Sequence, residues 1–222
     1  EEHQTFTVRT PHRDHPDLRL PLRGAFQARN AALAVAAVDL FAEARGVEVP
    51  ESAVRAGLAG VRWRARLERV ERGPDLYLDV AHTPESARAV AEGLGEDRPD
   101  LDPEENVLVF GCLSGKRVPE MLEPLSTLAR TIVVVPVRSE RSAPVDELRR
   151  AALGRFPRIL LAPGALDGLA LARAATGDDG FTLVTGSDYL AGEVLRAREG
   201  GAEEEPDLSD PGVVPRTDGA SR

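Results

Sequence analysis

The sequence is short of several kinds of residue, and each shortage excludes a class of protein. It contains a single cysteine, Cys112, among 222 residues, which excludes an intramolecular disulfide framework and fits a reducing, cytoplasmic location. No stretch approaches the ~20 consecutive apolar residues that a membrane-spanning helix needs, and the first residues lack the layout of a secretory signal peptide. We therefore expect a soluble protein that neither crosses nor binds a membrane.

Basic charge is scarce as well, and nearly all of it is arginine. The 28 lysine and arginine residues are outnumbered by 37 acidic ones, which gives a net charge of −9. Because a nucleic-acid groove needs a basic face, this balance argues against nucleic acid as a partner. Lys116 is the only lysine. Because an ammonium is a compact charge and a guanidinium is a planar fork, a binding site can require lysine rather than arginine at position 116. A single lysine can also occur at this position by chance.

The methionine content bears on where the protein begins. Met121 is the only methionine, so the sequence does not start with an initiator residue at Glu1. We expect that the chain is processed or belongs to a longer protein, with further machinery upstream. A length of 222 residues has room for one large domain or for one and a half small ones.

The first third of the sequence predicts a small unit of strands and helices. Residues 5–24 favour extended backbone and alternate apolar with polar side chains, which predicts two short strands. The alanine-rich residues 27–46 contain no proline and no internal glycine, so they predict a buried helix of about five turns that ends at Gly46. A second helix begins near Pro50. The charged residues 62–73 mark a domain boundary.

Apolar runs rich in β-branched residues alternate with helical stretches beyond this boundary. The runs lie at Leu76–Val80, Val107–Phe110, Ile132–Val135, Ile159–Leu161 and Phe181–Val184. The helical stretches lie at Pro84–Gly93, Pro119–Arg130, Val145–Leu153, Leu166–Ala175 and Tyr189–Arg198. This alternation predicts a Rossmann-like α/β domain, in which a mostly parallel sheet has helices on both faces. Ligands bind such sheets at the carboxyl ends of the strands.

The polar residues that follow the first of these runs suit a binding crevice. Asp79 and His82 lie three residues apart between the predicted strand and the next helix. An aspartate there can accept a hydrogen bond from a ribose or an amide, and a histidine can meet an oxyanion. The alternative is that Asp79 and Thr83 only cap the helix that begins at Pro84.

The loop after the second run carries the lone lysine. A Walker A phosphate loop has four residues between its glycines and Ser or Thr after its lysine. Here three residues separate Gly111 from Gly115, and Arg117 follows Lys116, so the loop is not a Walker A motif. The glycines, the two basic residues and the following helix still suit an anion site. A solvated basic turn is the alternative.

Residues near two helix starts complete the set of candidates. Ser187 or Asp188 can cap the last predicted helix, and its first N–H groups suit a carboxylate. Gln27 and Asn30 lie on one face of the first predicted helix, where amides can pack, cap or hold a ligand.

Five segments of the chain form an ordered set of motifs. They are GAFQARNA at Gly24–Ala31, WRARLE at Trp63–Glu68, DVAHTP at Asp79–Pro84, GCLSGKR at Gly111–Arg117 and TGSDYL at Thr185–Leu190. In this order they resemble the carboxyl-terminal half of the Mur ligase superfamily, and within it the folylpolyglutamate synthase and dihydrofolate synthase branch. That branch carries Gly-x-His-Gln-x-x-Asn-Ala, Trp-Pro-Gly-Arg-Leu-Glu, Asp-Gly-Ala-His-Asn-Pro, a glycine loop with Asp-Lys-Asp, and Thr-Gly-Ser-x-Tyr-Leu.

The resemblance implies an ATP-dependent amide ligase. In that family ATP phosphorylates the carboxylate of a folate or dihydropteroate, and the amine of glutamate attacks the resulting acyl phosphate. The resemblance further implies that Asn30, Arg66 and Asp79 bind the nucleotide.

The same resemblance assigns residues to the glutamate side of the reaction. It implies that His82 and Ser187 lie beside the incoming glutamate, and that Lys116 and His82 take part in catalysis. It also implies Mg²⁺ as a cofactor with ATP, with its ligands in a missing N-terminal domain and none in this segment.

A domain organisation follows from the resemblance. Residues 1–66 resemble the C-terminal remnant of the central ATPase domain, and residues 67–198 resemble the C-terminal, glutamate-binding domain. Residues 199–222 are rich in glycine, proline and acid and predict a disordered acidic tail. Because the family's P-loop lies upstream, we expect this segment alone to bind nucleotide weakly and to be inactive. We expect a monomer.

Several positions depart from the family's motifs. This chain has Phe26 where the motif has histidine, Thr83 where it has asparagine, and Arg64–Ala65 where it has Pro-Gly. Gly115 and Arg117 replace the two aspartates around the lysine. Two alternatives therefore stay open: another Mur-type ligase that joins a different amino acid to a different acid, and a non-catalytic Rossmann-like nucleotide-binding module.

Overall fold

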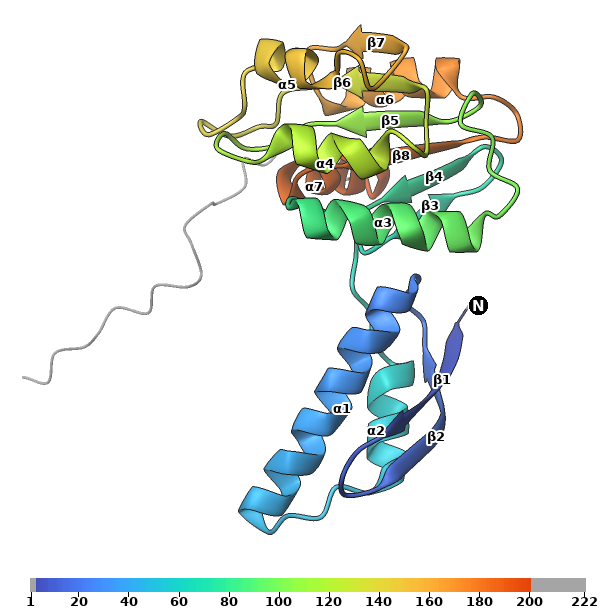
Figure 1. Cartoon of the computed structure of the whole chain (residues 1–222), viewed down its shortest axis with the longest axis vertical. Helices are drawn as coiled ribbons and strands as arrows, with labels where there is room; N and C mark the ends of the chain where they lie inside the picture. Colours follow the sequence, from blue (N-terminus) through green and yellow to red (C-terminus); the bar gives the residue numbers. More distant parts are fainter. Residues whose placement is uncertain (1–2, 201–222) are drawn as a thin grey trace, which may run out of the picture.

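The computed structural model describes residues 3–200, which form two units joined by a short linker (Figure 1). The smaller unit contains β1 (Gln4–Arg9), β2 (Asp14–Leu20), α1 (Ala25–Arg45) and α2 (Glu51–Ala59). The larger unit contains β3 (Glu68–Glu71), β4 (Asp75–Leu78), α3 (Pro84–Asp97), β5 (Val107–Phe110), α4 (Val118–Leu125), β6 (Thr131–Val134), α5 (Val145–Ala152), β7 (Arg158–Leu161), α6 (Ala165–Ala175), β8 (Phe181–Thr185) and α7 (Asp188–Arg198).

The smaller unit confirms the two predicted strands and both predicted helices. β1 and β2 pair antiparallel, with Gln4 opposite Leu20. α1 ends at Gly46, whose φ of 61° is left-handed backbone that glycine adopts without strain. The prediction of a helix that stops at this glycine is therefore correct.

The prediction that α1 is buried is wrong. One face of the helix, with Val35 at its centre, packs against β2 and α2. The other face carries Leu33, Leu40 and Phe41, whose exposed fractions are 72%, 55% and 58%. A helix that is apolar all round is expected to be covered on every side, and within residues 3–200 nothing covers this second face.

A buried polar network joins β2 to both helices of the smaller unit. His15 lies between two carboxylates, with Nε2 3.0 Å from Asp39 Oδ2 and Nδ1 2.7 Å from Glu51 Oε2. Thr10 and Arg13 also donate hydrogen bonds to Asp39. Burial alone would raise the pKa of Asp39, but the hydrogen bonds from His15, Thr10 and Arg13 lower it to about 2. Asp39 therefore stays ionised at neutral pH and anchors the network.

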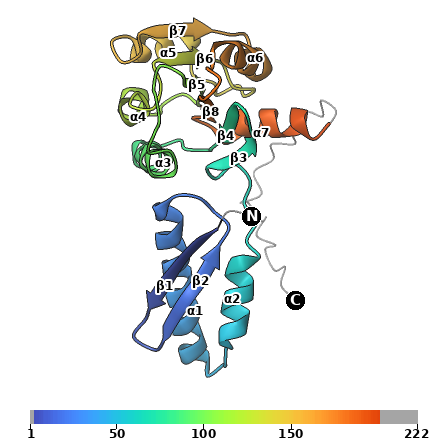
Figure 2. The ribbon, with the colours of Figure 1, turned by 90° about the vertical axis from the view of Figure 1, so that its right-hand side faces the viewer.

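The sheet of the larger unit confirms the predicted Rossmann-like fold. Its strands lie in the order β3-β4-β8-β5-β6-β7, and every neighbouring pair is parallel except β3 with β4. α3, α4 and α5 cover one face and α6 and α7 cover the other (Figure 2). β5, β6 and β8 are buried along their whole length, as expected for strands with helices on both sides.

Two elements differ from their sequence predictions. α4 ends at Leu125, earlier than the predicted end at Arg130, and the chain continues in a turn in which Thr127 N donates to Pro124 O. Glu68–Glu71 forms β3, an edge strand that was not predicted because its sequence, ERVE, is mostly charged. Charged side chains are common on edge strands, where one side of the strand faces water.

The two units contact one another beside the linker. Arg23 Nη1 donates to Asp97 Oδ1 at 2.7 Å, which joins the segment after β2 to the end of α3. Phe26, in the first turn of α1, packs against the hydrophobic core of the larger unit. Phe26, which departs from the histidine of the motif, therefore has a packing role at this contact.

Two further predictions concern membranes and the tail. Within residues 3–200 no helix is long and apolar enough to cross a membrane. From residue 201 on, the acidic tail predicted for residues 199–222 lies outside the described residues.

Candidate functional site

Three loops that carry predicted site residues meet at one edge of the sheet. Asp79 and His82 follow β4, Ser187 follows β8, and Lys116 lies in the loop after β5. These three strands are neighbours in the order β4-β8-β5, and all run parallel. The backbone pairing continues past the strands, because Asp79 N donates to Val184 O at 3.0 Å. The fold therefore brings these loops together at the carboxyl ends of the strands, where ligands bind such sheets.

Asp79 is buried, and its side chain connects the end of β4 to the linker. Its side chain accepts hydrogen bonds from the backbone N–H groups of Leu67, at 2.8 Å, and Ala81, at 2.7 Å. The residue is only 3% exposed. Asp79 does not cap α3, since Thr83 does so in a reciprocal capping box with Ser86. Asp79 instead fixes the turn that carries Arg66 against the end of β4.

The buried position of Asp79 changes its titration. Burial raises its pKa to about 6, against the opposing effects of the N–H groups of Leu67 and Ala81 and of the positive charge on Arg66. The folded state therefore binds the proton of Asp79 more tightly than the unfolded chain, whose aspartate has a pKa near 3.8. The protonated Asp79 contributes fully to the stability of the fold below about pH 4, and this contribution is lost as the pH rises through about 6.

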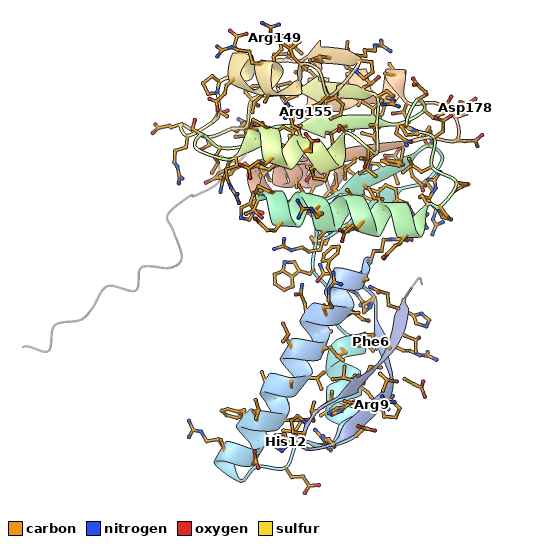
Figure 3. The ribbon with its side chains drawn as sticks, in the orientation of Figure 1. Phe6, Arg9, His12, Arg149, Arg155 and Asp178 are labelled. Carbon is orange, nitrogen blue, oxygen red and sulfur yellow. The ribbon has the colours of Figure 1, made fainter. Side chains whose placement is uncertain are left out.

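We expect the substitution Asp79→Asn to remove this pH dependence. Between about pH 4 and pH 7 the free energy of unfolding of the wild type should fall by about 2 to 3 kcal/mol more than that of Asp79→Asn. Urea unfolding at a series of pH values measures the difference. Asp178→Asn, in an exposed loop before β8 (Figure 3), is the matched control and should keep the wild-type slope. Parallel curves for wild type and Asp79→Asn would contradict the expectation.

A hydrogen bond of His82 determines which of its two ring nitrogens carries the proton when the ring is neutral. Nδ1 lies 3.0 Å from the carbonyl oxygen of Val80, which can only accept, so Nδ1 carries the proton. Nε2 of the neutral ring is then an acceptor. His82 is half-buried, and it can accept a hydrogen bond or a proton from an amine at this edge.

Ser187 caps α7, as one of the two sequence interpretations predicts. Its Oγ accepts from the backbone N–H of Tyr189 at 3.1 Å, and the residue is 3% exposed. The turn before it depends on Gly186, whose φ is 112° and whose missing side chain lets the loop approach Gly111. A Cβ on Gly186 would lie 2.6 Å from the carbonyl oxygen of Gly111. The β8 and β5 loops are therefore in close contact.

The sequence interpretation did not identify Thr185. Its hydroxyl is fully buried at the end of β8 and has no hydrogen-bond partner among residues 3–200. A buried hydroxyl normally has a partner. The signal in the sequence is its position, since Thr185 opens the TGSDYL segment.

The loop of Lys116 is held in place from several sides. Ser114 N donates to Arg141 O at 2.7 Å, which ties the loop to the one after β6. Arg117 Nη2 lies 3.0 Å from Glu85 Oε1, which ties it to the first turn of α3. Arg117, one of the departures from the motif, thus links the lysine loop to the helix that follows His82.

The ammonium of Lys116 has no hydrogen bond or ion pair in the part of the chain that the structure describes. The side chain is half-buried. Cys112, in the same loop, is not a competing nucleophile, because burial raises the pKa of its thiol to about 12. Among residues 3–200, Lys116 therefore offers a positive charge without a paired carboxylate at the carboxyl edge of the sheet.

The remaining two predicted residues lie on the linker side. Arg66 stacks on the ring of Trp63, with its guanidinium 5.0 Å from the ring centre, and its charge acts on Asp79. Asn30 is exposed on α1 and donates to Gln27 Oε1 at 3.2 Å. The structure therefore joins Arg66 to the site of Asp79, whereas the described contacts of Asn30 stay within α1.

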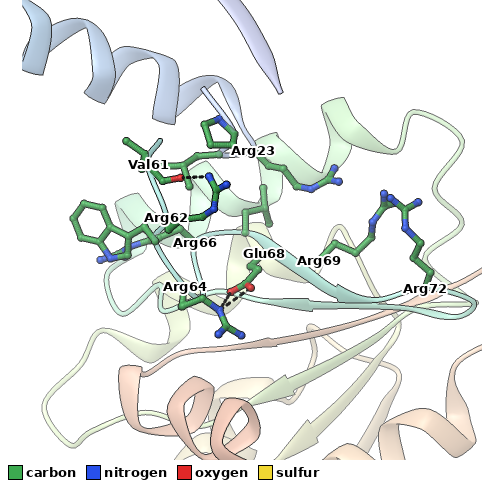
Figure 4. A pocket seen from close by; sticks show the side chains of 12 residues that line it. Arg23, Val61, Arg62, Arg64, Arg66, Glu68, Arg69 and Arg72 are labelled. Atoms are coloured by element: carbon green, nitrogen blue, oxygen red, sulfur yellow. Dashed lines mark hydrogen bonds and ion pairs between the residues drawn. The ribbon is translucent and has the colours of Figure 1, made fainter. Parts of the chain in front are cut away.

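A cavity of about 320 Å³ lies beside the linker and was not identified from the sequence (Figure 4). We name it the arginine pocket, after the six arginines among its lining residues: Arg23, Arg62, Arg64, Arg66, Arg69 and Arg72. The charged segment 62–73 was its only signal in the sequence. Within residues 3–200 no group of His, Cys, Asp and Glu side chains is arranged to hold a metal ion, so we assign no Mg²⁺ ligand to them.

Comparison with known proteins gives a family match and close relatives. The family described as "Mur ligase, glutamate ligase domain" matches residues 65–188. The chain is 34% identical over 194 residues to a dihydrofolate synthase/folylpolyglutamate synthase of Mycobacterium tuberculosis, covering 80% of this chain and 39% of that protein. The chain thus spans less than half the length of this relative.

Solved structures give the same match. Mycobacterium tuberculosis folylpolyglutamate synthase complexed with ADP aligns with a TM-score of 0.78 and 30% identity, over 88% of this chain and 46% of that one. E. coli FolC in complex with DHPP and ADP aligns with a TM-score of 0.70 and 26% identity, over 86% of this chain and 42% of that one.

Proposed function

The chain belongs to the Mur ligase family, and on this premise we propose that it is the C-terminal part of an ATP-dependent amide ligase that adds L-glutamate to folate or dihydropteroate. One observation carries the proposal. The loops of His82, Ser187 and Lys116 meet at one edge of the sheet, and they carry an imidazole, a helix N-terminus and an ammonium that has no partner among residues 3–200.

The proposed reaction has two steps. ATP transfers its γ-phosphoryl group to the carboxylate of the acid, which gives an acyl phosphate and ADP. The amine of glutamate then attacks the acyl carbon, and the tetrahedral intermediate collapses to the amide and inorganic phosphate. Negative charge develops on the acyl oxygen and the leaving phosphate, so fixed positive charge and backbone dipoles stabilise this transition state.

Each residue at the sheet edge has a role in the second step. Lys116 places its ammonium beside the phosphate and the developing oxyanion. His82 Nε2 accepts a proton from the attacking amine, which its neutral tautomer allows. Ser187 and the N–H groups at the start of α7 bind a carboxylate of glutamate.

The nucleotide is assigned to the linker side of the site. Arg66 supplies a guanidinium fork for a phosphate, and Asn30 supplies an amide from α1. Asp79 binds the nucleotide and holds the turn that carries Arg66 through the N–H of Leu67. Mg²⁺ accompanies ATP, and its ligands belong to the part of the ligase outside this chain.

The smaller unit fits the role of the end of an ATPase domain. In this proposal residues 1–66 complete the central domain and residues 67–198 form the glutamate-binding domain. The exposed apolar face of α1, with Leu33, Leu40 and Phe41, supports this division, since the rest of such a domain would cover it. A cytoplasmic location and a monomeric state stay predictions from the sequence.

Phosphate release by the full-length product that contains this chain tests the proposal. We expect ATP-dependent release that requires both L-glutamate and either a folate or dihydropteroate. Release with another amino acid or with a muramyl peptide instead would favour a different Mur-type ligase. The absence of release with every acid and amino acid tested would favour a non-catalytic module.

The 222-residue chain by itself should give no glutamate addition. The described residues provide one side of the site only, and the phosphate loop of the family lies elsewhere. The same assay on the isolated chain, with nucleotide binding measured in parallel, checks this. Measurable addition of glutamate to a folate by the isolated chain would refute the division of the site between two domains.

A further inference from the structure

The turn of the linker that carries Arg66 has a strained backbone. Ala65 and Leu67, on either side of Arg66, both have a positive φ, of 52° and 47°. This left-handed region is costly for residues that have a Cβ, so it persists only where the surrounding structure holds the chain in it. Both residues are buried, with exposed fractions of 3% and 0%. The contacts of this turn therefore decide where Arg66 lies.

Two carboxylates hold the turn, one on each side of Arg66. The backbone N–H of Ala65 donates to Glu68 Oε2 at 2.7 Å. The backbone N–H of Leu67 donates to Asp79 Oδ2 at 2.8 Å. Hydrogen bonds to an ionised carboxylate are stronger than those between neutral groups. Glu68 is thus the counterpart of Asp79 at the opposite end of the turn.

The carboxylate of Glu68 is itself held in place. Arg64 Nε donates to both of its oxygens, to Oε1 at 2.8 Å and to Oε2 at 3.1 Å (Figure 4). Arg64 Nη1 also pairs with Glu199, the residue after α7. The backbone of Glu68 opens β3, which fixes it to the sheet. Because side chain and backbone are both anchored, Glu68 is a rigid acceptor for the N–H of Ala65.

The guanidinium of Arg66 depends on this turn for its position. It lies over the ring of Trp63, 5.0 Å from the ring centre, and within residues 3–200 it has no hydrogen bond or ion pair. A cation–π contact at an exposed site is weak, so it does not by itself set the direction of the guanidinium. A guanidinium binds a phosphate through two parallel hydrogen bonds, which requires the correct orientation.

We propose that Glu68 is a positioning residue of the ligase, which orients Arg66 toward the nucleotide by accepting the N–H of Ala65. This inference rests on the proposed function, in which Arg66 binds a phosphate of ATP. Glu68 does not touch the nucleotide and acts only through the turn. Its loss therefore weakens the binding of ATP and leaves the loops that bind glutamate unchanged.

Two variants of equal side-chain length isolate the hydrogen bond. Glu68→Met and Glu68→Gln both remove the negative charge, but only Glu68→Gln keeps an oxygen that can accept from Ala65 N. In the full-length product, Glu68→Met should raise KM for ATP about tenfold and leave kcat and KM for L-glutamate nearly unchanged. Glu68→Gln should stay within about threefold of the wild-type KM for ATP. Equal KM values for the two variants, raised or not, would overturn the inference.

A double substitution tests whether Glu68 acts through Arg66. Arg66→Gln should itself raise KM for ATP, and adding Glu68→Met should change it little, since the residue that Glu68 positions is already absent. A further rise of about tenfold in the double variant would overturn the inference, because Glu68 would then act on the nucleotide independently. Glu71→Met is the matched control on β3. Glu71 pairs with Arg173 and Arg198, each at 2.5 Å, so its loss should leave KM for ATP unchanged.

Trp63 gives a measurement that needs no ligase activity. It is the only tryptophan of the chain, is 60% exposed and has Arg66 over its ring. In the 222-residue chain, Glu68→Met should increase the quenching of its fluorescence by acrylamide about as much as Arg66→Gln does, whereas Glu68→Gln and Glu71→Met should not. Wild-type quenching in Glu68→Met would overturn the inference while the ligase activity stands. Absence of ligase activity in the wild type would instead overturn the proposed function, and the quenching would still decide whether Glu68 positions Arg66.

Discussion

Replacement of Lys116 by alanine should lower the kcat of the full-length ligase by about 10²- to 10³-fold. Lys116 is half-buried, and its loop lies at the same sheet edge as the loops of His82 and Ser187. Its ammonium has no partner in the described part of the chain. Its loss leaves the developing charge on the acyl phosphate without its fixed counter-charge. Lys116→Arg should not restore the rate, because a planar guanidinium does not replace the compact point charge of an ammonium.

Phosphate release under saturating substrates measures this effect, and urea unfolding checks that the variant keeps its fold. Arg141→Gln is the matched control, since it removes a positive charge from the neighbouring loop that accepts from Ser114 N. It should retain nearly full activity. If Lys116→Ala keeps more than about a tenth of the wild-type kcat, Lys116 does not have the proposed role.

The substitution Gly186→Ala should destabilise the protein by about 2 to 4 kcal/mol. Two effects add. The φ of 112° is strained for any residue with a Cβ, and that Cβ would lie 2.6 Å from Gly111 O and 2.9 Å from the ring of Phe110. Relief of the clash must separate the loops after β8 and β5, so Ser187 and Lys116 should move apart and kcat/KM for glutamate should fall.

Gly154→Ala separates these two effects. Gly154 also has a positive φ, of 77°, but a Cβ there would meet nothing within 4 Å. Gly154→Ala should therefore lower the free energy of unfolding only through backbone strain, by about 1 kcal/mol. Denaturant unfolding of both variants gives the comparison. Equal destabilisation of the two variants would show that the close approach of Gly186 to Gly111 is unimportant.

Apolar runs made most of the sheet predictable. Val107–Phe110 and Phe181–Val184 are buried on both sides, so their sequences are continuously apolar and their positions are clear without a structure. β3 could not be found in this way, because an edge strand does not need an apolar sequence. The burial of α1 was predicted wrongly because an alanine-rich sequence indicates what a helix requires and not whether a covering element is present.

The site was predictable where it depends on the order of strands. Polar residues that follow parallel strands meet at one edge, and this brought His82, Ser187 and Lys116 into one set of candidates. The contacts of Asp79 were not predictable, since they depend on the N–H of Leu67 and on how the linker turn lies against β4. The arginine pocket was missed because Arg23 comes from a different unit and joins the others only in the fold.

Transfer of oxygen between substrates is the most direct test that this chain serves an acyl-phosphate ligase. The full-length product is supplied with ATP, L-glutamate and a folate whose reacting carboxylate carries ¹⁸O, and the inorganic phosphate is analysed by mass spectrometry. Because the phosphorylated oxygen leaves with the phosphate, one ¹⁸O atom should appear in phosphate for each amide formed. Amide formation with unlabelled phosphate would contradict the account.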